Sequence, residues 1–195
     1  MPTKPEPTPF FAHDRAAWRD WLAENHASEP SVWLLFFKKN TGKQRLTYEE
    51  SVEEALCFGW IDSVKKKLDD ESSVQFFSPR KPKSGWAKTN KIRIERLLAE
   101  GKMTAAGLEK IEAAKRDGSW TALDDIEKGI MPTDLAAVLE ENEAAKAHFT
   151  AFPSSVKKQI YTWIESAKTD PTRQKRLHET VGLAEKNVRD RKSVV

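Results

Sequence analysis

The sequence holds a single cysteine among 195 residues, which excludes a disulfide framework and a zinc site built from cysteines. Its longest uninterrupted apolar run, Val32–Phe37, is far shorter than the roughly 20 residues of a membrane-spanning helix. The eight glycines form neither a phosphate-binding loop nor a dinucleotide fingerprint. The first nine residues lack the apolar stretch of a signal peptide, so we expect a cytoplasmic protein with no membrane span.

Large aromatic side chains and charge are both plentiful. Seven tryptophans and nine phenylalanines need a hydrophobic core, which is typical of a globular protein. The charges fall into blocks: residues 78–96 carry a net +6, residues 117–153 a net −6 and residues 154–195 a net +5. Such blocks usually face water or pair with one another, but the two basic blocks could also offer a surface to an anionic partner.

The first part of the chain mixes helix and strand patterns. Apolar residues at helical spacing predict a helix over residues 14–26. A capping box at Thr47–Glu50 begins a second helix, and Gly59 is a suitable residue to end it. Between these helices, Ser31–Lys38 is typical of a strand buried on both faces.

Two further strands, Trp60–Lys66 and Val74–Arg80, flank a polar turn and predict an antiparallel hairpin. Pro79 ends the pairing because proline has no N–H to donate to a strand ladder. The pattern then predicts a helix over residues 86–100 with Ser84 as its N-cap.

From Thr104 onward the pattern is helical, with single helices expected over residues 105–116, 123–128 and 134–149. Two amphipathic helices follow, separated by a break at Thr169–Pro171, and predict an αα-hairpin. We therefore expect an α+β fold: a small, mainly antiparallel sheet packed with helices, followed by a helical C-terminal module that ends in the αα-hairpin.

The same patterns suggest a division of the chain. We expect a disordered lead-in over residues 1–11 and an α+β domain over residues 12–118. A helical C-terminal module over residues 119–195 follows, either separate or packed into the same core. The last residues, beyond Asn187, are expected to fray.

The search for catalytic motifs finds little. No two histidines have the spacing of metal ligands on one helix face, so we expect neither a metal nor a cofactor. Cys57 lies beside Leu56 and Phe58 on a predicted helix, a setting typical of a buried structural cysteine. A nucleophilic or redox role is the alternative.

Polar, basic and aromatic residues gather in residues 59–62 and 77–88. A hairpin register that sets Trp60 opposite Arg80 and Asp62 opposite Ser78 would place these four side chains on one face. Basic side chains would then surround the start of the following helix, where free amides and the helix dipole favour an anion. We expect a site for a small anionic ligand, a carboxylate or a phosphate, formed by Trp60, Asp62, Ser78, Arg80, Ser84, Trp86 and Lys88.

Other interpretations stay open. Asp62 and Arg80 could form a structural salt bridge, with the tryptophans in the core and the lysines solvated. An enzyme could use Asp62 as acid or base and Arg80 to stabilise negative charge, although a binding protein is favoured. Nucleic acid could bind basic segments 78–96 and 154–195, which is less expected because an acidic block offsets them. A protein partner is also open.

Two motifs carry a resemblance to a known family. Glu54–Ser63 (EALCFGWIDS) and Phe77–Asn90 (FSPRKPKSGWAKTN) resemble the hallmark pair of the YdeI/OmpD-associated family of bacteriocin-protection proteins. Trp163–Lys168 and Thr172–Leu177 resemble the helical module that ends those proteins, so the resemblance extends over roughly residues 10–188. It implies a small bacterial protein linked to tolerance of bacteriocins or antimicrobial peptides and, by name, to porins. It implies no settled reaction and transfers no catalytic residues.

Overall fold

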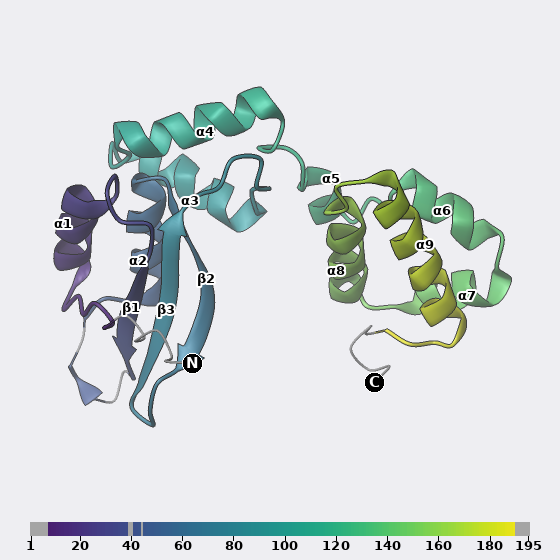
Figure 1. Cartoon of the computed structure of the whole chain (residues 1–195), viewed down its shortest axis with the longest axis horizontal. Coiled ribbons are helices and arrows are strands. Elements are labelled where there is room, and N and C mark those ends of the chain that lie inside the picture. Colours follow the sequence, from purple (N-terminus) through teal and green to yellow (C-terminus); the bar gives the residue numbers. More distant parts are fainter. Residues whose placement is uncertain (1–7, 39–40, 44, 190–195) are drawn as a thin grey trace, which may run out of the picture. The chain divides into compact units, whose positions relative to one another are not determined.

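The structure is a computed structural model that describes residues 8–38, 41–43 and 45–189. Residues 1–7 of the expected lead-in over residues 1–11, and the last six residues of the expected frayed tail, lie outside these. The chain divides into two units, Met1–Thr121 and Ala122–Val195, and each unit has its own cluster of buried hydrophobic side chains. Both units are drawn in Figure 1.

The described part of the first unit combines four helices with one three-stranded sheet. Its elements in chain order are α1 (Arg15–Asn25), β1 (Val32–Phe37), α2 (Tyr48–Cys57), β2 (Trp60–Lys67), β3 (Ser72–Pro79), α3 (Lys88–Ala99) and α4 (Ala105–Asp117). The strands are antiparallel in the order β1-β3-β2, so β3 is central. The expected α+β class, with a small antiparallel sheet and a helical C-terminal part, is confirmed.

Strand β1 differs from its expected burial. Only Leu34 of this strand is fully buried, because β1 lies at an edge of the sheet. The prediction of a strand buried on both faces was therefore wrong. Phe10, which the sequence placed in the lead-in, instead forms a parallel bridge with Leu34 and exchanges hydrogen bonds with the backbone of β1.

The β2–β3 hairpin forms where expected but in another register. Trp60 lies opposite Pro79, Ile61 opposite Ser78 and Asp62 opposite Phe77. The expected pairing, one residue away from this, applies only beyond an irregularity between Asp62 and Lys65. A shift of one residue exchanges the faces of a strand, so Ser78 shares a face with Ile61 and not with Trp60 or Asp62.

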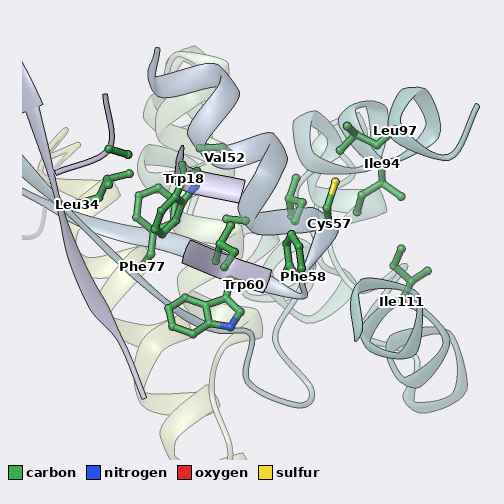
Figure 2. Close-up of a cluster of buried hydrophobic side chains, with 14 of the residues drawn as sticks. Trp18, Leu34, Val52, Cys57, Phe58, Trp60, Phe77, Ile94, Leu97 and Ile111 are labelled. Atoms are coloured by element: carbon green, nitrogen blue, oxygen red, sulfur yellow. The ribbon is translucent and has the colours of Figure 1, made fainter. Parts of the chain in front are cut away.

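Helix α2 and the core around it follow the sequence closely. Thr47 accepts a hydrogen bond from the amide of Glu50, whose side chain accepts one from the amide of Thr47, and this confirms the capping box. Figure 2 shows the side chains of α1, α2, α3 and β3 meeting in one cluster. At its centre the indole of Trp18 packs against Phe77 at 5.3 Å between ring centroids.

Two glycines set the close approach of α4 to the end of α2. A Cβ on Gly107 would lie 2.3 Å from the carbonyl oxygen of Cys57, and the same oxygen accepts a 2.6 Å hydrogen bond from the Thr104 hydroxyl. Gly59, with φ of +73°, follows α2, and a Cβ there would lie 2.6 Å from Cγ of Lys110. The absent side chains therefore let α4 lie directly against the α2–β2 connection.

The start of α3 also differs from the expectation. The helix begins at Lys88, with Ala87 at the N-cap and no side-chain cap, whereas Ser84 was expected to cap a helix from Trp86. Residues 80–87 instead form an irregular loop, in which the Ser84 hydroxyl bonds to the carbonyl of Lys81 at 2.7 Å. Pro82 and Gly85 of this stretch delay the helix by two residues.

The described part of the second unit is helical, with α5 (Asp124–Lys128), α6 (Thr133–Glu140), α7 (Glu143–Ala151), α8 (Ser154–Glu165) and α9 (Asp170–Glu185). Two helices, α6 and α7, take the place of the single helix expected over residues 134–149. Asn142 separates them and caps α7, because its side-chain oxygen accepts a hydrogen bond from the amide of Ala145. The αα-hairpin is confirmed as α8 and α9, with Thr169 capping the second helix. In the described residues, no helix is both long and apolar enough to cross a bilayer.

An ion pair in the second unit should make the unfolding free energy depend on pH. Arg173 donates to both carboxylate oxygens of Asp134, and these hydrogen bonds lower the pKa of Asp134. A carboxylate whose pKa is lower in the folded protein than in the unfolded chain stabilises the fold at pH values above its unfolded pKa. This stabilisation is lost as the pH falls through the pKa of the folded protein. Asp134→Asn should therefore lower the unfolding free energy by about 1 kcal/mol at pH 7, allowing for the partly exposed pair, and by nothing near pH 2.

Urea unfolding at the two pH values, followed through amide signals of α6 and α9, measures this difference. An equal loss at both pH values would contradict an ionic origin.

Candidate functional site

Of the seven side chains that the sequence grouped into a site, Arg80 and Trp86 meet. The guanidinium carbon of Arg80 lies 3.6 Å from the centroid of the Trp86 ring. Ser84 adjoins them through its backbone carbonyl, which accepts a 3.4 Å hydrogen bond from Arg80 Nη2. Among the described residues, Ser78 lies opposite Ile61 and makes no hydrogen bond with Arg80 or Trp86, and Lys88 begins α3 as an exposed residue.

Trp60 and Asp62 serve other parts of the fold. Trp60 is buried in the core, and its indole N–H donates to the carbonyl of His26 at 3.1 Å. Asp62 accepts hydrogen bonds from the Tyr48 hydroxyl at 2.7 Å and from the Gln75 amide at 3.1 Å. Burial, together with this bond to Asp62, raises the pKa of Tyr48 to about 12. Asp62 and Arg80 do not form the salt bridge considered above, since neither has the other as a partner.

Arg80 lies at the end of β3, where its amide donates to the carbonyl of Gly59 at 2.9 Å. The side chain turns inward and is only 6% exposed. Its Nη2 donates to the carbonyls of Gly85 and Ser84, while its buried Nε has no acceptor. The short loop explains why Arg80 and Trp86 come together: only five residues lie between them, and the loop closes through hydrogen bonds from Arg80 itself.

The charge of Arg80 is not compensated. Among the described residues no carboxylate pairs with this guanidinium, in contrast to Arg15, Arg19 and Arg173. Burial alone lowers the pKa of Arg80 to about 10, which keeps the group cationic at neutral pH. A buried cation without a counter-ion is costly.

A cavity of about 230 Å³ lies against this arginine. The loop after β3 forms one wall with Arg80 and Trp86, and α4 and the residues after it form the other. The cavity is lined by Arg80, Lys81, Pro82, Lys83, Trp86, Glu109, Lys110, Ala113, Ala114, Asp117 and Ser119.

Asp117 joins the two walls. Its carboxylate accepts hydrogen bonds from the amide of Ser119 at 2.9 Å and from the amide of Lys83 at 3.3 Å, and bonds from these residues lower its pKa. Lys83 has a left-handed backbone with φ of 59°, which is uncommon for a residue with a side chain. The contact with Asp117 holds this strained loop residue against the end of α4.

The wall formed by α4 could not be located from sequence. Glu109, Lys110, Ala113 and Asp117 recur at helical spacing, so one face of α4 could be predicted, but nothing local indicates what that face meets. The contact depends on Gly59 and Gly107, which lack side chains where α2 and α4 approach each other. The sequence alone does not show that these two helices are neighbours.

Cys57 is buried beside this wall, and Figure 2 shows its side chain next to those of Ile94 and Leu97. Burial raises the pKa of the thiol to about 11, so the thiolate is scarce at neutral pH. We expect a thiol reagent such as Ellman's reagent to leave the native protein unlabelled and to react fully after denaturation. Rapid labelling of the native protein would instead support a reactive cysteine.

In the part of the chain that the structure describes, no three His, Cys, Asp or Glu side chains are grouped so that they could hold a metal ion.

Comparison with known proteins finds two families along the chain. Residues 10–110 match a domain of unknown function (DUF8412), and residues 128–187 match the family described as bacteriocin-protection, YdeI or OmpD-associated. No curated protein and no solved structure matches. The named family is therefore confirmed on the C-terminal helices, whereas the motifs at residues 54–63 and 77–90 fall in the domain of unknown function. The chain belongs to the family of this domain of unknown function, whose model covers more than half of its residues, and its C-terminal helices match the YdeI/OmpD-associated family of bacteriocin-protection proteins.

Proposed function

We propose that this protein binds a small anion in the cavity at Arg80. One observation carries the proposal: an arginine that is 6% exposed and has no counter-ion among the described residues lines a cavity of about 230 Å³. An anion entering the cavity would supply the missing charge, and Lys81, Lys83 and Lys110 would add to the attraction.

The cost of burying Arg80 supports binding over a purely structural role. Stacking on Trp86 and two bonds to backbone carbonyls hold the side chain in place, but neutral acceptors do not offset a buried charge. A structural arginine in this protein looks different: Arg173 bonds to both Asp134 and Glu165. The free protein therefore carries an unfavourable charge that a ligand would neutralise.

Binding is also favoured over the two other functions that the sequence left open. An acid–base reaction would need Asp62 near Arg80, and Asp62 does not line the cavity. Nucleic-acid binding through basic segment 78–96 would need free cations, but Arg93 and Arg96 of this segment pair with Glu49 and Glu53. A site with one buried cation is better suited to a small ligand.

The family's description connects it with bacteriocin protection. We propose that the anion-bound protein acts in that process, within the cytoplasm. Cells that depend on this protein for survival of bacteriocin treatment should then lose protection with Arg80→Gln and keep it with Lys115→Gln.

Thermal unfolding and titration calorimetry with sulfate, phosphate and acetate test the binding itself. A ligand at 100 times its dissociation constant should add about 2.7 kcal/mol of stability. Arg80→Gln should abolish the effect. Lys110→Gln, which removes a lining cation, should weaken binding, whereas Lys115→Gln on the same helix but outside the cavity should not.

Two salt concentrations separate site binding from general attraction, since interactions of exposed charges are screened by salt. Stabilisation that persists at 300 mM NaCl and disappears in Arg80→Gln would support the site. Stabilisation that is unchanged in Arg80→Gln and Lys110→Gln would overturn the anion site. If Arg80→Gln folds poorly, the comparison of Lys110→Gln with Lys115→Gln still decides the test.

A further inference from the structure

The side chains of the residues that line the cavity carry a net charge of +2. Its lining contains four cationic side chains, and the only carboxylates among the lining residues are Glu109 and Asp117. Asp117 is already occupied by two backbone N–H groups. A ligand with two negative charges therefore complements this lining better than a monoanion does.

The geometry of Arg80 also discriminates between anions. Arginine recognises a planar carboxylate through two parallel N–H groups, which form a fork. In Arg80, Nη2 is committed to the carbonyls of Gly85 and Ser84, and Nε is sealed from solvent. Nη1 has no hydrogen bond to any described residue and is not among the buried unpaired atoms. Arg80 can therefore offer a ligand one NH2 group of its guanidinium and not the two parallel donors of a complete fork.

The remaining donors come from different directions. Lys81 and Lys83 lie on the loop after β3, and Lys110 lies on α4 at the opposite wall. A tetrahedral group with three terminal oxygens can accept from several directions at once, and lysines bind such groups as separate point charges. A carboxylate, with only two oxygens, is less suited to donors from several directions.

The size of the cavity is compatible with a small group attached to the anion. A volume of about 230 Å³ has room for a phosphate with a short substituent.

We infer that the ligand of this site is a dianionic phosphate group, either inorganic phosphate or a short phosphomonoester. This inference rests on the proposed function, because it names the anion that the Arg80 cavity takes. The apolar parts of the lining, Trp86, Pro82, Ala113 and Ala114, would contact the substituent of an ester.

Calorimetric titration of the full-length protein with methyl phosphate, sulfate and acetate tests the inference. At pH 7.5 methyl phosphate should bind about tenfold or more tightly than acetate, the factor that one additional charged hydrogen bond gives. Inorganic phosphate in a parallel titration distinguishes the two sources: tighter binding of methyl phosphate indicates an ester, and equal binding indicates the phosphate group alone. Both outcomes support a phosphate site.

The pH dependence provides a second readout. The second pKa of a phosphomonoester is about 6, so the dianion fraction, and with it the apparent affinity for methyl phosphate, should fall about fourfold from pH 7.5 to pH 5.5. Sulfate keeps its two charges over this range and corrects for any titration of the protein. Arg80 stays cationic, and Asp117, with its lowered pKa, stays ionised, while Lys81, Lys83, Glu109 and Lys110 complete the charged groups that face the ligand.

The possible failures are distinguishable. If acetate binds as tightly as methyl phosphate and Arg80→Gln abolishes both, the phosphate inference is wrong and the anion site stands. If methyl phosphate binding relative to sulfate does not change with pH, the dianion is not required and the inference is also wrong. If no anion binds in a way that depends on Arg80 or Lys110, both the inference and the proposed function fail.

Discussion

Replacing Gly107 with alanine should destabilise the first unit by about 1–3 kcal/mol, the range for overpacking a close contact. The added Cβ would meet the carbonyl oxygen and carbon of Cys57 at 2.3 and 2.8 Å, and backbone atoms cannot rotate out of the way. The helix α4 must then move away from α2. Because α4 also supplies Lys110 and Asp117 to the cavity, anion affinity should fall in the same variant.

Gly182 provides a matched control for this substitution. It is also a helical glycine, in α9, but nothing lies within 4 Å of its Cβ position. Gly182→Ala should therefore stabilise the second unit by about 0.5–1 kcal/mol, the difference in helix propensity between glycine and alanine. Thermal unfolding of both variants measures the contrast. Equal stabilisation by the two substitutions would contradict the close approach of α4 to Cys57.

Replacing Arg80 with methionine should abolish anion binding and change the stability of the ligand-free protein little. Methionine fills a similar volume and removes a buried charge that lacks a counter-ion, which is neutral or stabilising by about 1–2 kcal/mol. The loss of stacking on Trp86, worth about 0.5–2 kcal/mol, and of the bonds to the carbonyls of Ser84 and Gly85 offsets this gain. Stability and binding should thus move independently, as expected for a residue kept for function.

Arg173→Met is the matched control, since it removes an arginine that is fully partnered. It breaks the bonds to Asp134 and Glu165 and should cost about 1–2 kcal/mol, moderated by the partial exposure of the pair. Denaturant unfolding without added anion, with phosphate-free buffer, compares the two variants. If Arg80→Met is destabilising to the same extent as Arg173→Met, Arg80 is a structural residue.

The elements predicted well from sequence are those specified by local chemistry. The capping box at Thr47 and the turn between β2 and β3 each act within a few residues, and the structure contains both. Asn142 carried a similar local signal, an N-cap within the segment expected as one helix. The strand order could not be read locally, so β1 was expected to be buried on both faces, although it lies at an edge.

The candidate site was only partly predictable for the same reason. Arg80 and Trp86 lie close in sequence, and the loop between them brings them together. Asp62 was assigned through a strand register, and the irregularity between Asp62 and Lys65 changes that register without a clear local signal. The wall with Lys110 and Asp117 depends on contacts between α2 and α4, which are distant in sequence.

Mapping of backbone amide shifts on titration with methyl phosphate tests most directly whether the Arg80 cavity binds an anion. The largest shifts should fall on residues 80–86 and 109–119, the two walls of the cavity, and should saturate with a single dissociation constant. The same residues should stay unperturbed in Arg80→Met. Shifts confined to exposed lysines elsewhere, such as Lys65 and Lys67 of β2, or the same shifts in Arg80→Met, would show that the cavity is not the binding site.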